Sequence, residues 1–93
     1  MDKITKPQFS IITVVKNDEK NIQKTIESIL NQTFKNFEYI IIDGKSEDST
    51  LSLINKYKDK INFIISEKDD GIYFAMNKGA KIACGEFVVY VNS

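Results

Sequence analysis

The 93-residue sequence predicts an α/β fold, doubly wound, with a mostly parallel four-stranded sheet and helices on both faces. Four short apolar runs are rich in β-branched and aromatic residues, and they are nearly continuous rather than alternating. Such runs are typical of parallel strands that are covered on both sides. Between the runs the apolar residues recur at helical spacing, which gives the order βαβαβαβ. Right-handed crossovers then place helices on the sheet faces, and we expect residues 1–93 to form a single domain.

The strands are expected at residues 9–15, 37–42, 61–65 and 87–91. Each run is short and bounded by polar residues, as strands are. Because none of the four alternates between apolar and polar positions, we expect both faces of every strand to be buried.

Three amphipathic stripes predict the helices between these strands. They consist of Ile22, Ile26, Ile29 and Leu30; of Leu51, Ile54 and Tyr57; and of Ile72, Ala75, Met76, Gly79, Ile82 and Ala83. Asn17 and Asp18 are candidate caps of the first helix, and Gly85 is expected to end the third. Gly79 lies on the apolar stripe, which indicates close approach of the helix to the sheet. Cys84 is expected to be a small core residue at a buried helix end.

Composition excludes several classes of function. Thirteen Lys and Arg balance thirteen Asp and Glu, so we expect no nucleic-acid partner. The absence of histidine excludes Ser-His-Asp and Cys-His catalysis and histidine-ligated zinc. A single cysteine excludes an internal disulfide and suits a reducing compartment. No apolar run approaches the roughly 20 residues of a membrane span, and the first residues lack a signal peptide, so we expect a cytoplasmic protein.

Polar residues follow every predicted strand at its carboxyl end, which is where open parallel sheets bind ligands. Asp43 is the most informative of them, because it comes directly after three isoleucines. A carboxylate at the lip of a buried strand can accept hydrogen bonds from a ligand's N–H or hydroxyl groups. The same side chain can instead close the turn or cap the helix that follows, and the sequence leaves both interpretations open.

Two familiar nucleotide-binding motifs are absent. Residues 44–46, Gly-Lys-Ser, resemble the end of a phosphate-binding P-loop, but Tyr39 stands where that motif needs its first glycine. The dinucleotide fingerprint would follow the first strand, yet the four glycines lie at positions 44, 71, 79 and 85. A nicotinamide or flavin site is therefore not expected.

The ordered set of segments resembles the opening half of family 2 glycosyltransferases of the GT-A fold, in particular bacterial enzymes that build surface polysaccharide. The segments are SIITVVKN at 10–17, TIESILNQT at 25–33, FEYIIIDG at 37–44 with Ser46, Asp48 and Thr50 after it, DGIY at 70–73, AMNKG at 75–79 and GEF at 85–87. The similarity covers nearly the whole chain from about Phe9 onward. No single motif is decisive, but the order and spacing together are specific.

The resemblance implies a Rossmann-like sheet in the strand order 3-2-1-4 and a nucleotide-sugar site, with a UDP-linked donor most typical. Asp43 matches the acid that hydrogen-bonds the base. The nucleotide-binding residues implied in this sequence are Thr13, Val15, Asn17, Asp43, Asp70, Asn77 and Lys78. The acceptor would be a polysaccharide or a lipid-linked glycan, which places the enzyme in the cytoplasm or at the inner face of the membrane.

The resemblance also implies what the chain lacks. In this family the strand that holds Phe87 leads into an acidic pair that binds Mg²⁺ or Mn²⁺, and the sequence stops at Ser93, before such a pair. We therefore expect the donor-binding part of a metal-dependent transferase, with no metal site or catalytic residue of its own and no activity alone. A sheet cut here would leave an unpaired edge and exposed apolar surface, which favours self-association.

Two other classes of function remain as alternatives. A receiver-like signalling module would use an acidic pair after the first strand, which Asp18 and Glu19 could mimic. That fold needs five strands and an acid after the third, where this sequence has Ser66 and Glu67. A purely structural, oligomerising fragment is the second alternative, and it predicts that no ligand has an effect.

Overall fold

The computed structural model describes residues 7–68 and 71–93, without the side chains of Ile72 and Tyr73. The elements, in chain order, are β1 (Phe9–Val15), α1 (Ile22–Leu30), β2 (Phe37–Asp43), α2 (Thr50–Asn55), a short 3-10 turn (Lys58–Lys60), β3 (Phe63–Ser66), α3 (Ile72–Ile82) and β4 (Phe87–Tyr90). All four predicted strands and three helices are present. No helix in this part of the chain is long and apolar enough to cross a membrane.

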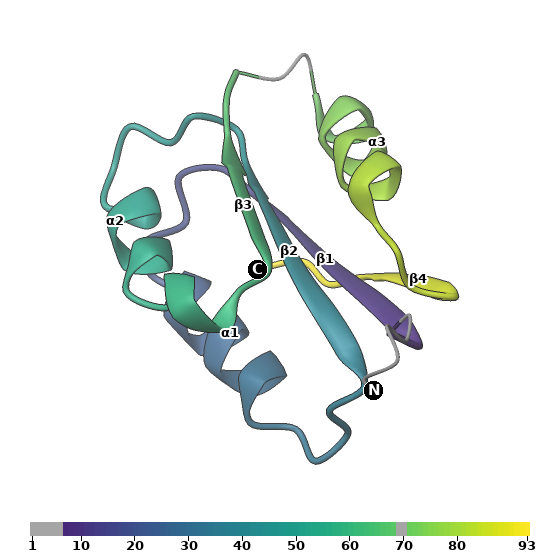
Figure 1. Cartoon of the computed structure of the whole chain (residues 1–93). Coiled ribbons are helices and arrows are strands. Elements are labelled where there is room, and N and C mark those ends of the chain that lie inside the picture. The colour runs from purple at the N-terminus through teal and green to yellow at the C-terminus, as the bar shows by residue number, and fades with distance from the viewer. Residues whose placement is uncertain (1–6, 69–70) are drawn as a thin grey trace.

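The four strands form one parallel sheet in the order β3-β2-β1-β4 (Figure 1). Phe9 lies opposite Phe37 of β2 on one side and opposite Phe87 of β4 on the other. The predicted strand order 3-2-1-4 is therefore confirmed. Because all strands run the same way, the loops after β1, β2 and β3 meet at one edge of the sheet.

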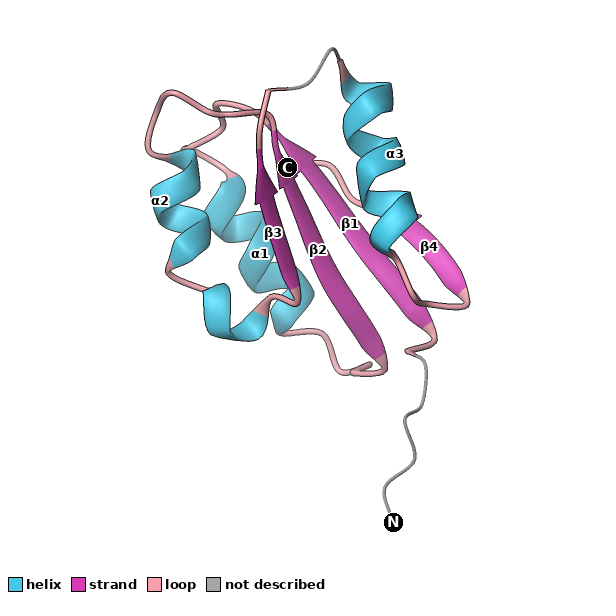
Figure 2. Ribbon diagram, turned by 45° about the horizontal axis from the view of Figure 1, so that its top comes forward, coloured by secondary structure: helices cyan, strands magenta, loops and turns pink. Residues whose placement is uncertain are grey.

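Helices cover both faces of the sheet, as the sequence predicts. Figure 2 shows α1 and α2 on one side and α3 on the other. The first side buries a core that includes Ile11, Tyr39 and Ile41 of the sheet against Ile22 and Ile26 of α1. The second side buries a smaller core of Ile12, Ile40 and Ile42 against Ala75 of α3. Consecutive isoleucines in β2 thus pack in different cores on the two faces of the sheet. This explains why apolar and polar residues do not alternate along this strand.

The expectation that every strand is buried on both faces is wrong for β3 and β4. In β4 the exposed fractions are 52% for Phe87, 40% for Val88, 39% for Val89 and 41% for Tyr90. The reason is the placement of the helices, since α3 packs on β1 and β2 and α1 packs on α2. Within the described residues no helix packs closely on the strands at the two edges. The side chains of β4 and Phe63 of β3 are therefore exposed, and Ile64 and Ile65 of β3 are only partly buried against the two cores.

Two expected helix boundaries also need correction. Asn17 and Asp18 are not the caps of α1, because the cap residue is Asn21. The third helix, α3, ends at Ile82 with Ala83 as its C-terminal cap residue, so Gly85 does not end this helix. Cys84 consequently lies beyond the helix and is exposed, not buried in the core.

Gly79 confirms the predicted close approach of α3 to the sheet. A Cβ atom at this position would lie 2.7 Å from Ile12 Cγ2, nearer than van der Waals contact allows. Ile12 itself is fully buried, so its side chain has little room to move. The glycine therefore sets how closely α3 can lie on β1.

We expect Gly79→Ala to lower the free energy of unfolding by about 1–2 kcal/mol, although alanine is the better helix former by about 1 kcal/mol. Urea denaturation of the single variant, of Ile12→Ala and of the double variant measures the effect. Because Ile12→Ala removes the obstructing atoms, the double variant should lose less stability than the sum of the two. Simple additivity would contradict the packing argument.

Candidate functional site

Asp43, the last residue of β2, lies at the carboxyl edge of the sheet and is fully buried. Its carboxylate accepts three hydrogen bonds, from the Ser46 N–H at 2.9 Å, the Ser46 hydroxyl at 2.5 Å and the Ser66 hydroxyl at 2.8 Å. A carboxylate offers about four acceptor sites, so three protein donors leave one. The structure therefore confirms that Asp43 closes its own turn, and its predicted contact with a ligand stays a prediction.

The loops that follow β1 and β2 are joined to each other by hydrogen bonds. Together with the loop after β3 they form the carboxyl edge of the sheet, which we call the rim. The Asn17 N–H donates to Ser46 Oγ at 2.8 Å, and Asn17 Oδ1 accepts from the Glu47 N–H at 2.7 Å. Asn17 and Lys45 have φ angles of 50° and 59°, in the left-handed region that few non-glycine residues adopt. Such strained residues persist only where surrounding contacts hold them, and they concentrate at functional sites.

A pocket of about 390 Å³ opens on this rim. Its lining comes from all three loops and consists of Lys16, Gly44, Lys45, Glu47 and Lys68. Three ammonium groups against one carboxylate make it locally positive in a chain with no net charge. The lysines were not among the predicted site residues. The signal that could have found them is position, since each lies within two residues of the end of its strand.

Thr13 and Val15 are buried in the sheet, below this rim. The hydroxyls of Thr13 and Tyr39 share a hydrogen bond of 2.9 Å, and both side chains are fully buried. Burial raises the pKa of Tyr39 to about 12, and the hydrogen bond to Thr13 opposes part of that rise. Val15 packs in the core that faces α1. Both residues support the rim from beneath, and their predicted role in binding a nucleoside stays a prediction.

We expect the pH dependence of stability to report the burial of Tyr39. In the unfolded chain its phenol titrates near pH 10, and in the folded chain near 12. Between these values the unfolded state loses a proton that the folded state keeps, so stability falls as pH rises, by up to about 1.4 kcal/mol per pH unit. Chemical denaturation at pH 9 to 11.5 should show a shallower decline for Tyr39→Phe. Equal slopes for the two proteins would contradict this prediction.

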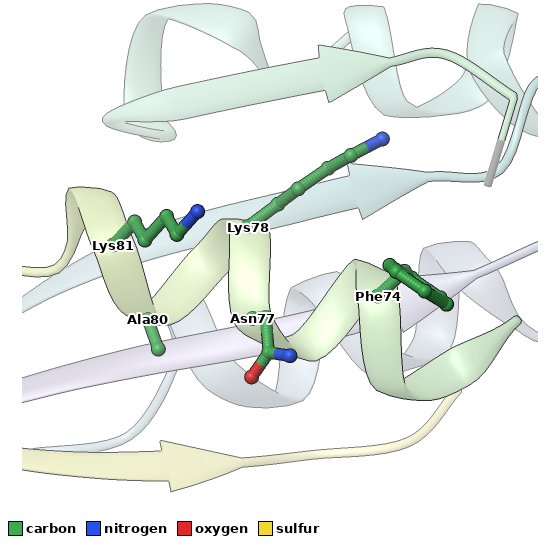
Figure 3. A pocket seen from close by; sticks show the side chains of 5 residues that line it. All are labelled: Phe74, Asn77, Lys78, Ala80 and Lys81. Atoms are coloured by element: carbon green, nitrogen blue, oxygen red, sulfur yellow. The ribbon is translucent and has the colours of Figure 1, made fainter. Parts of the chain in front are cut away.

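The residues predicted from the third loop and α3 do not gather at the rim pocket. Figure 3 shows Asn77 on the β4 side of α3 and Lys78 extending toward the β3 side. Lys78 forms an ion pair of 2.6 Å with Glu67, which follows β3 directly. A separate hollow of about 480 Å³ lies along α3, lined by Phe74, Asn77, Lys78, Ala80 and Lys81. Asp70 lies outside the described residues.

Residues 7–68 and 71–93 contain no cluster of side chains that could bind a divalent metal ion. This part of the chain has no group of three or more acidic, cysteine or histidine side chains placed to hold an ion. Two acidic residues near the rim, Asp48 and Asp18, are engaged with the protein itself. A hydrogen bond from the Thr50 hydroxyl lowers the pKa of Asp48. Asp18 is hydrogen-bonded to Asn21 and Ser93.

A parallel sheet in the order β3-β2-β1-β4 with helices on both faces defines a Rossmann-like α/β domain, and its positive pocket lies at the carboxyl edge, where such sheets bind ligands. Comparison with known proteins then identifies the family. The profile described as "Glycosyl transferase family 2" matches residues 10–93, so the chain belongs to glycosyltransferase family 2. The match favours the transferase over the receiver-like alternative.

Curated relatives are bacterial glycosyltransferases that are considerably longer than this chain. It is 41% identical over 85 residues to WfaP of Escherichia coli, a UDP-Glc:α-D-GlcNAc-diphosphoundecaprenol β-1,3-glucosyltransferase. The match covers 90% of this chain and 34% of WfaP. It is 35% identical over 91 residues to the cholesterol galactosyltransferase of Borreliella burgdorferi, covering 96% and 25%. The chain thus spans about a quarter to a third of these relatives.

Solved structures show the same fold. The S. aureus TarS fragment 1–349 superposes with a TM-score of 0.82 at 33% identity, covering 91% of this chain and 27% of that fragment. The same fragment with bound UDP-GlcNAc gives a TM-score of 0.83. The Pyrobaculum calidifontis mannosyltransferase, in complex with GDP-Man and Mn²⁺, has a TM-score of 0.84 at 22% identity, with 95% of this chain and 28% of that one covered. This last likeness concerns the fold alone.

Proposed function

We propose that this chain is the donor-nucleotide part of a glycosyltransferase that moves a sugar from a UDP-linked donor to a polysaccharide or lipid-linked acceptor. The observation that carries the proposal is the rim at the carboxyl ends of β1, β2 and β3, where Lys16, Lys45 and Lys68 line one pocket. Asp43 lies buried directly before Gly44, another residue of the pocket lining. Asp43 would offer its remaining acceptor position to an N–H of the base. The lysines would attract the phosphates, whose charge they oppose.

Similarity to proteins with defined ligands supports this choice of donor and acceptor. A structure of TarS, 33% identical to this chain, contains UDP-GlcNAc. WfaP is named as a glucosyltransferase with UDP-Glc as donor and a GlcNAc-diphosphoundecaprenol acceptor. An acceptor with such a lipid would place the enzyme in the cytoplasm, at the inner face of the membrane.

The test is binding of UDP to the 93-residue chain by isothermal titration calorimetry. We expect Lys16→Ala, Lys45→Ala and Lys68→Ala, combined in one variant, to weaken UDP binding about tenfold, because several surface charge contacts of a few tenths of a kcal/mol each are lost. The matched control removes three exposed lysines elsewhere, at positions 24, 56 and 60. Equal weakening in both variants would show a general charge effect and contradict a site at the rim.

We also propose that the whole enzyme uses Mg²⁺ or Mn²⁺. A mannosyltransferase with the same fold was solved in complex with GDP-Man and Mn²⁺, which supports the choice of ion. The described residues do not provide its ligands, so they would come from outside residues 7–68 and 71–93. Addition of Mg²⁺ or Mn²⁺ to the 93-residue chain should therefore change its affinity for UDP less than twofold.

We propose, further, that the isolated chain self-associates through β4, whose four residues are between 39% and 52% exposed. The strand is apolar, it carries no charge, and its outer edge has no partner among the described strands. Sedimentation velocity from 10 µM to about 1 mM should show growing oligomers, and Val89→Lys should reduce them. A wild-type chain that remains monomeric over this range would contradict the proposal.

A further inference from the structure

The end of the chain is tied to the loop after β1. The Ser93 hydroxyl donates a hydrogen bond of 2.6 Å to Asp18 Oδ2, between residues that lie 75 positions apart. Just before it, the Val91 N–H still donates to the Ile12 carbonyl at 2.9 Å. The chain that leaves β4 therefore stays beside β1 up to Val91, and the Asp18 contact holds the two residues after it.

Asp18 is itself fixed from three sides. Its N–H donates to Oγ1 of Thr50, a fully buried residue, at 2.8 Å. Its Oδ1 accepts from the Asn21 side-chain amide at 3.1 Å, and its carbonyl accepts the N–H groups of Asn21 and Ile22 at the start of α1. The carboxylate is thus oriented by its own loop, and Ser93 meets a preformed acceptor.

The same loop is part of the pocket rim. Asn17, the neighbour of Asp18, is bonded to Ser46 and Glu47, and Ser46 is bonded to Asp43. A continuous series of contacts therefore links Ser93 to Glu47, which lines the pocket, and to the buried Asp43. In a parallel sheet, the exits of β1, β2 and β4 lie at one edge, so a segment that follows β4 begins at the rim where a ligand would bind.

We propose that Asp18 is a positioning residue that holds the backbone leaving β4 against the rim of the nucleotide pocket. Its role would be to set the direction in which the protein continues past Ser93, as the longer relatives do, and hence the placement of groups that act on the bound donor. It would not touch the nucleotide itself. This inference rests on the proposed function, because only in a sugar transferase would the backbone that leaves β4 position groups that act on the bound donor.

The contact itself is tested on the 93-residue chain by {¹H}-¹⁵N heteronuclear NOE at Asn92 and Ser93, which reports picosecond-to-nanosecond order. We expect rigid values in the wild type, a clear fall in Asp18→Ala and Ser93→Ala, and retention in Ser93→Thr, which keeps the hydroxyl. Thermal denaturation confirms that each variant is folded. Equal values in all four proteins, or loss of order in the threonine variant as well, would overturn the proposal.

The positioning role is tested in the protein at its full natural length by steady-state sugar transfer. We expect kcat to fall about tenfold in Asp18→Ala and in Ser93→Ala, the change that loss of one charge-assisted hydrogen bond gives, while KM for the nucleotide-sugar changes less than twofold. Asp18→Asn and Ser93→Thr, which keep an acceptor and a donor, should recover most of kcat. Unchanged kcat, or a rise in KM alone, would overturn the role.

A failure of the proposed function gives a different result. In that case the wild-type protein would neither bind nor use any nucleotide-sugar, whereas the NOE measurements would still decide whether Asp18 holds the end of the chain.

Discussion

Replacing Asp43 with alanine is expected to lower the free energy of unfolding by about 3 kcal/mol and to abolish measurable UDP binding. The loss of stability follows because three donors, two on Ser46 and one on Ser66, would lose a buried acceptor at once. The loss of binding follows because Ser46 also anchors Asn17, so the rim and the proposed acceptor for the base disappear together. Urea denaturation and calorimetry below the unfolding transition measure the two effects.

Ser66→Ala is the matched control for this variant. It removes one of the three donors and leaves the carboxylate in place, so we expect a loss of about 1 kcal/mol and nearly unchanged UDP affinity. An Asp43→Ala protein that is folded and binds UDP as tightly as the wild type would remove Asp43 from the site. If Ser66→Ala weakens UDP binding as much as Asp43→Ala does, the Asp43 carboxylate acts by holding the rim in shape and not by contacting the base.

The second large effect is expected for Gly85→Ala, with a loss of about 3 kcal/mol or more. A Cβ atom at this position would lie 2.5 Å from the Ser10 nitrogen and 2.6 Å from the Phe9 carbonyl carbon. These are backbone atoms of β1, which cannot turn aside as a side chain can, so the connection between α3 and β4 would have to move away.

That movement would also break a buried polar cluster at the amino end of the sheet. The Gly85 N–H donates to Ser10 Oγ at 2.7 Å, and the N–H of Cys84 donates to Glu38 Oε2 at 2.5 Å. The Ser10 hydroxyl donates to the same carboxylate oxygen. Glu38 is only 7% exposed, so a donor lost here leaves a poorly solvated charge.

Gly44→Ala is the control for Gly85→Ala. A Cβ atom at Gly44 would make ordinary contacts of 3.5 Å with the side chain of Lys16. We expect little change or a small gain in stability, because alanine restricts the unfolded chain. Circular dichroism during urea denaturation compares the two variants. If Gly85→Ala is as stable as Gly44→Ala, the close approach at Gly85 is not a constraint on the fold.

The sequence predicted the layout of the fold because that layout depends on local patterns. The apolar run of β2 and the stripe of Ile22, Ile26 and Ile29 each report which faces are buried, and the structure places them in the expected core. Gly79 was also predictable, because a glycine on an apolar helical stripe has few reasons to be there other than close packing. The parallel sheet was predicted from the continuous apolar runs, whereas the strand order 3-2-1-4 came from the family resemblance.

The features of the fold and of the site that the sequence did not predict depend on contacts between residues distant in the sequence. No local sequence pattern indicates such contacts. An apolar run such as that of β4 does not say what covers it, and here no described helix covers it closely. Cys84 was expected in the core because α3 was extended two residues too far. The partners of Asp43, the bond between Asp18 and Ser93 and the position of three lysines around one pocket all arise only once the loops meet in space.

Titration of UDP into the ¹⁵N-labelled chain, followed by amide chemical shifts, decides whether the carboxyl edge of the sheet binds the nucleotide of the donor. We expect the largest shifts at residues 13–17, 43–47 and 66–68. Shifts centred instead on the hollow of about 380 Å³ that Pro7, Gln8, Asn36 and Glu86 form at the opposite edge, or no shifts at millimolar UDP, would contradict this expectation.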